Sequence, residues 1–298
     1  MATQELVSSY GPTVFKGLAV AGAGGLVLSQ LTKKAEAESG APKKIFPRAG
    51  PSFTRLTLEK TEDVNHNTKK LRFALPDENA VSGLPLTSAL LTVAVPKGSW
   101  LPVLRPYTPI TPSDTQGHMD LLVKRYPQGK QSTHLHSLVA GDSVMFAVCI
   151  PGYSWTANKH KSVTLIAGGA GITPIYQLVQ GILNNPEDKT KITLVFGVNG
   201  EQDVLLNEEF KKYEASHPGQ FNAVYAVSGL KDESDGRFRK GYVTEALLKE
   251  VAAPASDENT KVMVCGPPAM EEALLGKKGK GGGVLEKLGY RKDQVHKF

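Results

Sequence analysis

The sequence has few cysteines. Cys149 and Cys265 are the only two among 298 residues, and they lie far apart in the chain. Two cysteines cannot form a disulfide framework or a cysteine-rich metal centre. The sequence therefore predicts neither a disulfide scaffold nor a metal site.

A strong charge of either sign is also lacking. Lysine and arginine total 35 against 29 aspartates and glutamates, so the formal net charge is +6, and basic runs such as Lys69-Lys70 are short. This balance does not indicate a nucleic-acid-binding protein, although it would favour an acidic partner. Apolar residues make up 40% and charged residues 21%, a globular composition that excludes a largely disordered or collagen-like chain.

Long apolar runs are scarce, and only residues 14–31, VFKGLAVAGAGGLVLSQL, approach one. A membrane helix needs about 20 apolar residues, so this one is short, but its glycines are better tolerated in lipid than in water. No basic residue precedes Lys16 and the first arginine is Arg48, which is unlike a cleaved presequence. We expect residues 1–32 to be an uncleaved membrane anchor and residues 33–52 a linker. A soluble tail and a cleaved targeting segment are the alternatives.

The segment from 53 to 153 has the pattern of short β-strands. Runs rich in Val, Leu, Thr and aromatic residues are separated by Pro, Gly, Asp and Asn, which is typical of strands and turns. The runs cover residues 53–60, 69–75, 89–95, 120–126 and 144–148, with one short helix expected at 132–139. Strands at this spacing predict an antiparallel β-barrel or a sandwich.

The segment from 160 to 298 alternates between strands and helices. Strands are expected at 162–167, 192–197, 222–227 and 261–266, and helices at 173–183, 203–215, 243–251 and 268–275. This alternation predicts a doubly wound parallel sheet, which binds ligands at the carboxyl ends of its strands. The predicted fold is therefore β plus α/β, with an antiparallel barrel followed by a parallel-sheet domain.

Two glycine-rich segments follow strands of the second half. One is Gly168-Gly169-Ala170-Gly171-Ile172-Thr173-Pro174, and the other is Cys265-Gly266-Pro267-Pro268-Ala269-Met270. Glycines let a ligand approach the backbone, and a helix N-terminus offers free N–H groups to phosphate. Thr173 is expected to cap the helix and Pro174 to lie in its first turn. Either segment alone is also explained by a tight turn, but two on one sheet edge predict a dinucleotide site.

Two further motifs lie in the strand-rich half. Arg105-Pro106-Tyr107-Thr108-Pro109-Ile110 combines a cation suited to phosphate with a ring that can stack on a planar group. Gly129-Lys130-Gln131-Ser132 opens the expected short helix and offers a second phosphate cradle. The alternatives are an edge strand with a surface arginine and an ordinary turn.

Taken together and in this order, the motifs resemble those of the NADH–cytochrome b5 reductases, which belong to the wider ferredoxin-reductase type. The resemblance also includes the segment from His66 to Phe73, Val123-Lys124-Arg125-Tyr126 and the terminal Phe298. The runs GYRKDQVHKF and TLIAGGAGITPIYQLVQGIL are most similar to the fungal mitochondrial branch.

The resemblance implies a function for each half of the chain. The barrel would bind FAD and the parallel-sheet domain would bind NADH. The enzyme would move a hydride from NADH onto FAD and pass single electrons to cytochrome b5 or a similar acidic haem protein. The branch implies an anchor in the mitochondrial outer membrane, with the endoplasmic reticulum as the alternative.

The resemblance also implies roles for individual residues. Thr108 would place its hydroxyl near flavin N5, His66 would hydrogen-bond Thr108 and assist proton movement, and Thr173 would lie between flavin and nicotinamide. The residues implied to bind FAD are Arg105, Pro106, Tyr107, Thr108, Val123, Lys124, Tyr126, Gly129, Lys130, Gln131, Ser132 and Thr173. Those implied to bind NADH are Lys124, Gly168, Gly169, Gly171, Thr173, Pro174, Ser228, Cys265, Gly266, Pro267, Met270 and Phe298.

The sequence departs from the family pattern at the end of the strand expected at 222–227. Animal members have an aspartate there, and an acidic group at this place binds the ribose 2′-hydroxyl and repels a 2′-phosphate. This chain has Ser228, with Lys231, Arg237 and Arg239 nearby. We expect NADH to be preferred, with NADPH accepted more weakly.

Other functions remain possible at this point. A reductase of the same fold could serve a quinone or a ferredoxin-like protein. A membrane-anchored binding protein could keep the fold without turnover. A dehydrogenase without flavin is opposed by the strand-rich first half.

Overall fold

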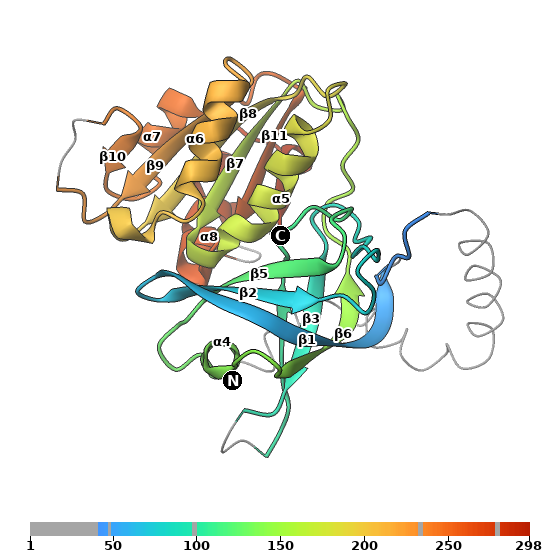
Figure 1. The fold of residues 1–298 in the computed structure, drawn as a ribbon. Helices are drawn as coiled ribbons and strands as arrows, with labels where there is room; N and C mark the ends of the chain where they lie inside the picture. The colour runs from blue at the N-terminus through green and yellow to red at the C-terminus, as the bar shows by residue number, and fades with distance from the viewer. Residues whose placement is uncertain (1–40, 47–48, 97–99, 232–234, 278–280) are drawn as a thin grey trace.

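Two six-stranded sheets organise the structure, a computed structural model that describes residues 41–46, 49–96, 100–231, 235–277 and 281–298 (Figure 1). The anchor predicted over residues 1–32 lies outside this range. Within the described residues, no helix has both the length and the apolar character needed to span a bilayer.

The first sheet is antiparallel and has the strand order β4-β3-β6-β1-β2-β5. Its strands are β1 (Gly50–Asn65), β2 (Thr68–Ala74), β3 (Ala89–Ala94), β4 (Val103–Tyr107), β5 (His118–Lys124) and β6 (Ser143–Ile150). Helix α4 (Lys130–Ser137) contacts both edge strands, β4 and β5. The sheet therefore curls round a single core with α4 across its open side, and the antiparallel flavin-domain fold predicted from the sequence is confirmed.

Alternating apolar residues build the core of this domain. Leu56 and Leu58 on β1 are buried while their neighbours are exposed, as expected for a strand with one face inward. Phe146 packs edge-on against Phe73 and Phe46, with ring centroids 5.3 and 6.2 Å apart. Phe46 falls within the linker predicted over residues 33–52, and β1 itself begins at Gly50. The core of the folded domain therefore begins before residue 53, because it includes apolar residues that precede its first regular strand.

The second sheet is parallel throughout, with the order β10-β9-β8-β7-β11-β14. Its strands are β7 (Ser162–Gly168), β8 (Lys191–Val198), β9 (Phe221–Val227), β10 (Phe238–Lys240), β11 (Thr260–Cys265) and β14 (Val295–Lys297). A short hairpin, β12 (Gly276–Lys277) and β13 (Gly281–Gly282), lies outside it.

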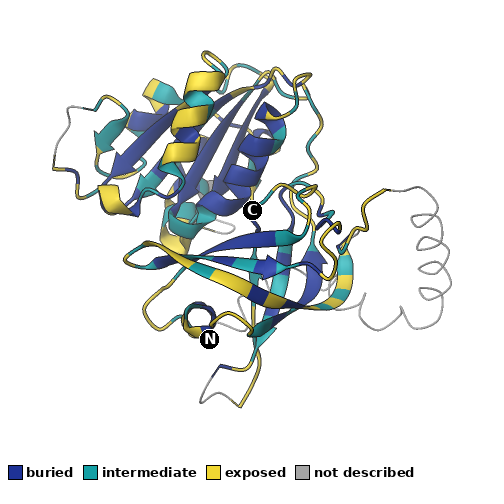
Figure 2. Ribbon diagram, in the orientation of Figure 1, coloured by how far each residue is buried: buried dark blue, intermediate teal, exposed yellow. Residues whose placement is uncertain are grey.

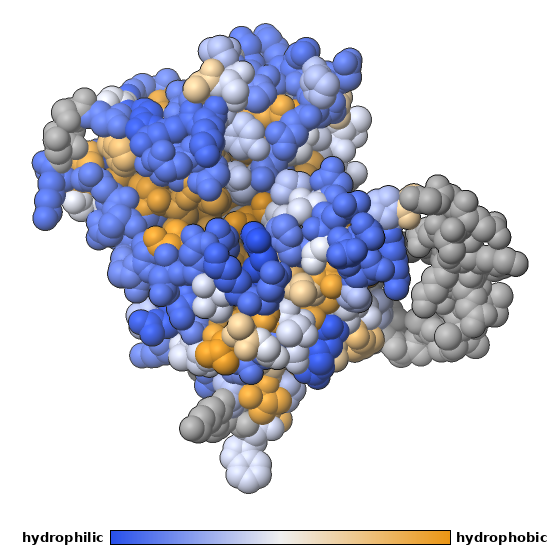
Figure 3. Space-filling view, in the orientation of Figure 1, coloured by the Kyte–Doolittle hydropathy of each residue, from blue (hydrophilic) through white to orange (hydrophobic). Residues whose placement is uncertain are grey.

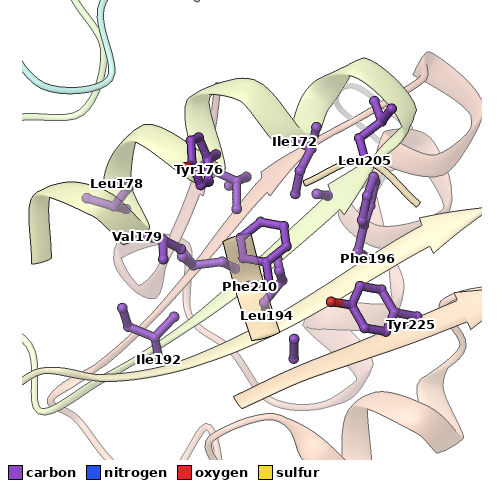
Figure 4. Packing of buried hydrophobic residues seen from close by; sticks show 14 of the residues in the cluster. Ile172, Tyr176, Leu178, Val179, Ile192, Leu194, Phe196, Leu205, Phe210 and Tyr225 are labelled. Atoms are coloured by element: carbon purple, nitrogen blue, oxygen red, sulfur yellow. The ribbon is translucent and has the colours of Figure 1, made fainter. Parts of the chain in front are cut away.

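Helices cover both faces of the parallel sheet. Helices α5 (Ile172–Leu183) and α6 (Asn207–Ser216) pack on one face, and α7 (Glu245–Val251), α8 (Pro268–Leu275) and α9 (Val284–Lys287) on the other. Side chains of α5 and α6 meet alternate residues of β8 and β9 (Figure 4). The strands are buried on both sides while the outer faces of the helices are exposed (Figure 2), which is the doubly wound arrangement predicted.

Some elements differ from those predicted. The helix expected at 203–215 divides into a short 3-10 helix, η2 (Glu201–Asp203), and α6, because Leu206 adopts a left-handed backbone with φ of 61°. Val204 and Leu206 lie in the turn between η2 and α6 and pack against the core. Their apolar character made the turn resemble part of a helix in the sequence. Strands β10 and β14 have three residues each, too few for a recognisable pattern.

Candidate active site

A chain of two hydrogen bonds links the first turn of α4 to the backbone of Arg105. The Gln131 amide donates to Thr92 Oγ1 at 2.9 Å, and Thr92 Oγ1 donates to the Arg105 carbonyl at 3.0 Å. Helix α4 begins after Gly129 with no side-chain cap and no acidic residue in its first turn. Arg105 donates to the Leu104 carbonyl, and in the described part of the chain it forms no ion pair with a carboxylate. The backbone of Arg105 is thus tied to the first turn of α4. A guanidinium and an uncapped helix N-terminus both suit a pyrophosphate, so these residues fit FAD.

Some residues predicted to bind FAD can do so only through their backbone. The side chain of Gln131 is buried and engaged by Thr92. Val123 belongs to the barrel core, and its carbonyl lies 2.7 Å from a ring nitrogen of His136. Ser132 Oγ donates to the Gly129 carbonyl and accepts from the backbone N–H of Tyr126. Ser132 thus stabilises the turn that opens α4.

Tyr107 and Thr108 extend from β4 towards the second domain. Burial raises the pKa of the Tyr107 phenol far above its ordinary value, against the opposing charge of Arg105, so the ring stays neutral. Thr108 is buried. The next residue, Pro109, accepts a hydrogen bond of 2.8 Å from the amide of Gln177 on α5. This bond joins the predicted flavin motif to the first helix of the other domain, a link that no sequence pattern indicated.

His66 lies in the turn between β1 and β2. One of its ring nitrogens is 2.9 Å from the Asn67 amide nitrogen and 3.9 Å from Asp203 Oδ1. The hydrogen bond to Thr108 that the resemblance implied is not formed within the described residues. The ring is instead held at the surface by its neighbour in the turn.

The two glycine-rich segments meet at one edge of the parallel sheet, as predicted. Strands β7 and β11 are adjacent, with Ala167 opposite Cys265. A Cβ built on Gly171 would lie 2.2 Å from the Cys265 carbonyl oxygen, and one on Gly168 would lie 2.5 Å from Met270 Sδ. The loops therefore pack together without space for side chains, and only glycine allows this approach.

Helix α5 starts without the cap that we predicted. Gly171 is its N-cap residue, and Thr173 lies in the first turn, where its hydroxyl donates to the Ala170 carbonyl at 3.2 Å. Pro174 lies in the first turn as predicted. Gly171 occupies the N-cap position and has no side chain. No side chain caps the N-terminus of α5, and its first turn contains no acidic residue. This end suits the phosphates of a dinucleotide.

Cys265 is not a nucleophile. Burial raises the pKa of its thiol to about 12, and the charge of Glu271 adds to this while Lys297 opposes it. A neutral thiol is unreactive. Phe298 lies close by, because its backbone N–H donates to the Val264 carbonyl just before Cys265.

Ser228 and the two arginines near it in sequence each already have a partner. Ser228 Oγ donates to the Asn199 carbonyl at 3.3 Å. Arg237 pairs with Asp235 at 2.8 Å, and Arg239 pairs with Glu250 at 3.1 Å. The two arginines that we expected to favour a 2′-phosphate are thus neutralised by carboxylates.

Apolar residues line part of the surface between the domains. Orange side chains gather in the hollow between the parallel-sheet domain and the barrel domain (Figure 3). Ile110 after the flavin motif packs against the core of the second domain. An apolar seam between two phosphate-binding edges can hold flat rings stacked on each other, so the fold and the site define a flavin- and nicotinamide-dependent oxidoreductase.

Comparison with known proteins agrees with this class. Residues 55–150 match the oxidoreductase FAD-binding domain family, and residues 165–275 match the oxidoreductase NAD-binding domain family. NADH-cytochrome b5 reductase 2 of Pyricularia oryzae is 47% identical over 87% of this chain and 80% of its own. That of Emericella nidulans is 44% identical over 96% and 90%. The cytochrome b5 reductase domain of Ulva prolifera nitrate reductase superposes with a TM-score of 0.72 at 28% identity, over 87% of this chain and all of that one.

This chain belongs to the NADH-cytochrome b5 reductase family. The predicted family, its oxidoreductase activity and its cofactors FAD and NADH are therefore confirmed. The individual site residues, the weaker use of NADPH and the membrane anchor remain predictions.

Proposed function

We propose that this protein takes a hydride from NADH onto FAD and passes single electrons to a cytochrome b5-type haem protein. The observation that carries this proposal is the hydrogen bond from Gln177 to the Pro109 carbonyl. Thr173 precedes Gln177 by four residues on α5, so both lie on one face of the helix. Thr108 and Thr173 therefore flank the same part of the seam between the domains.

The residues supply binding and orientation. FAD, when bound, provides the exchange between a two-electron donor and one-electron acceptors. Arg105 and the backbone of α4 would hold the pyrophosphate of FAD. The neutral Tyr107 would lie against the flavin ring. The glycine loops and the start of α5 would hold NADH. Thr108 and Thr173 would align the two rings, since hydride transfer needs reacting atoms about 3–3.5 Å apart.

A charge argument supports the acidic haem acceptor. The chain carries a formal net charge of +6, which favours encounter with an acidic protein at low salt. Rates measured with cytochrome b5, a quinone and a ferredoxin would separate the proposed acceptor from the others.

We also propose that residues 1–32 anchor the protein in the mitochondrial outer membrane, with the endoplasmic reticulum as the alternative. The apolar segment 14–31 and the resemblance to the fungal mitochondrial branch support this. Extraction of membrane fractions with alkaline carbonate tests it, because an anchored chain stays in the pellet whereas a peripheral one is released.

The first experiment on activity is an absorption spectrum of the purified protein before and after NADH is added without oxygen. We expect flavin bands that bleach with NADH. A colourless protein, or bands that ignore NADH, would favour a binding protein that keeps the fold without turnover.

Replacement of Arg105 by glutamine should weaken FAD binding by about 10- to 150-fold, because a charge-assisted contact to phosphate contributes roughly 1.5–3 kcal/mol. Titration of the apoprotein with FAD, followed by flavin fluorescence, gives the dissociation constants. Arg55→Gln is the control, since Arg55 is an exposed barrel arginine that bonds only Ser143 among the described residues. Equal losses in both variants would contradict the role of Arg105.

Replacement of Ser228 by aspartate should restore discrimination against NADPH. A carboxylate at this strand end repels a 2′-phosphate, so kcat/KM with NADPH should fall at least tenfold more than kcat/KM with NADH. Ser228→Asn adds similar bulk without charge and should leave the ratio near its original value. If the ratio of kcat/KM for NADH to that for NADPH does not change in Ser228→Asp, the ribose that carries the 2′-phosphate does not bind beside Ser228.

A further inference from the structure

The end of β5 reaches across to the second domain. Lys124 Nζ lies 3.0 Å from Asp203 Oδ1 on η2, and the two side chains are only 12% and 7% exposed. Beside this pair, the Asn65 amide donates to the Gln202 carbonyl at 2.9 Å. The last residue of β5 is therefore held by the loop that follows β8.

Asp203 is a fixed anion at the carboxyl edge of the parallel sheet. Its second oxygen accepts from the backbone N–H of Gly200 at 3.2 Å, which holds the carboxylate in η2. Burial raises the pKa of Asp203, but the hydrogen bond and charge of Lys124 outweigh this and leave the pKa below its ordinary value. Asp203 is thus a carboxylate at neutral pH.

A second group close to Lys124 also crosses to the nucleotide edge. The Tyr126 hydroxyl accepts from the backbone N–H of Ala170 at 3.3 Å, within the glycine-rich loop. An ammonium and a backbone N–H are the donors that bind a dinucleotide phosphate. Both donors bond groups of the protein itself, Asp203 and the Tyr126 hydroxyl.

We propose that Asp203 sets the affinity for the nicotinamide nucleotide by holding the Lys124 ammonium, which the nucleotide takes from it on binding. This inference rests on the proposed placement of NADH beside Lys124. In a buried site the attraction of the carboxylate for the ammonium is strong. Separating Lys124 from Asp203 therefore costs free energy and lowers the affinity for the nucleotide. His66, whose Nε2 lies 3.9 Å from the same carboxylate oxygen, is a second partner for Asp203 when Lys124 leaves.

The test uses the FAD-loaded, oxidised full chain and NAD⁺ as the ligand, with dissociation constants from titration calorimetry. Asp203→Asn keeps an oxygen for Gly200 and removes the charge, so NAD⁺ should bind about 3- to 10-fold more tightly, the range of a modest coupling between groups. The KM for NADH should fall by a similar factor without a rise in kcat. Asp203→Glu should behave like the original protein. Glu201→Gln removes an exposed carboxylate from the same turn and should change nothing.

The pair of Lys124 variants separates the possible failures. Lys124→Met should weaken NAD⁺ binding, and the gain from Asp203→Asn should disappear in the Lys124→Met background. If Lys124→Met binds NAD⁺ normally, the placement of the nucleotide is wrong. If Lys124→Met binds weakly but Asp203→Asn brings no gain, or the gain persists without the lysine, the exchange of partners is wrong and the placement stands. Asp203→Ser replaces Asp203→Asn if the latter loses FAD.

Discussion

Alanine in place of Gly171 should destabilise the protein by about 3 kcal/mol or more, the size typical of a severe steric clash, and raise the KM for NADH at least tenfold. The new Cβ would lie 2.2 Å from the carbonyl oxygen of Cys265, 2.5 Å from its carbon and 2.9 Å from the nitrogen of Gly266. These are backbone atoms, so no rotamer change relieves the contact. The two glycine-rich loops would have to separate, and the nucleotide edge would lose its shape.

Thermal unfolding and NADH kinetics of the FAD-loaded variant measure both effects. Gly236→Ala is the matched control, because a Cβ there meets nothing within 4 Å and its φ is not in the left-handed region. It should leave the midpoint of unfolding and the KM unchanged. A Gly171→Ala protein as stable and active as this control would show that the loops are not packed against each other.

Asparagine in place of Asp188 should lower the free energy of unfolding by about 2–4 kcal/mol, since several charge-assisted hydrogen bonds to a buried carboxylate are lost together. Asp188 is 2% exposed. It accepts from Trp155 Nε1 at 2.7 Å, from the Asn158 backbone at 3.2 Å, and from Thr190 through its hydroxyl at 2.7 Å and its backbone at 3.1 Å. One carboxylate thus holds the connection between the domains against the start of β8.

The destabilisation should depend on pH. Burial raises the pKa of Asp188, but the hydrogen bonds from Thr190, Trp155 and Asn158 outweigh it and leave the pKa below its ordinary value. A carboxylate with a depressed pKa stabilises the fold above its unfolded pKa of about 3.9, and this contribution is lost as the pH falls through the folded pKa. The difference between the original protein and Asp188→Asn should therefore be full at pH 7 and shrink below about pH 4.

Denaturant unfolding followed by tryptophan fluorescence reports this directly, because Trp155 is one of only two tryptophans. Glu187→Gln, at the exposed neighbouring carboxylate, should change stability by less than about 0.5 kcal/mol, as surface substitutions usually do. A pH-independent loss in Asp188→Asn would mean that packing, and not the carboxylate, holds the connection.

The local pattern of residues in the sequence was sufficient to predict the two kinds of sheet. Runs of β-branched and aromatic residues predicted the antiparallel sheet, and alternation of strands with helices predicted the parallel one, because burial of one face imposes a period that is visible in the sequence. That period also places the glycine loops after β7 and β11 at one edge, since parallel strands end on the same side. The ordered motifs from Arg105 to Met270 were enough to indicate the family.

Pairings between distant segments were decided only by the tertiary structure. Lys124 and Asp203 lie 79 residues apart in sequence, and Gln177 and Pro109 lie 68 apart. No local period encodes such contacts, because they depend on how two separately folded cores pack. The same reason explains why His66 lies near Asp203 and not Thr108. The bond from Thr173 to Ala170 and the pairing of Arg237 with Asp235 are instead short-range contacts, which the turns inside the second domain set. The residue patterns alone therefore give the two sheets and their nucleotide edges, whereas the packing of one domain on the other sets which side chains meet across the seam.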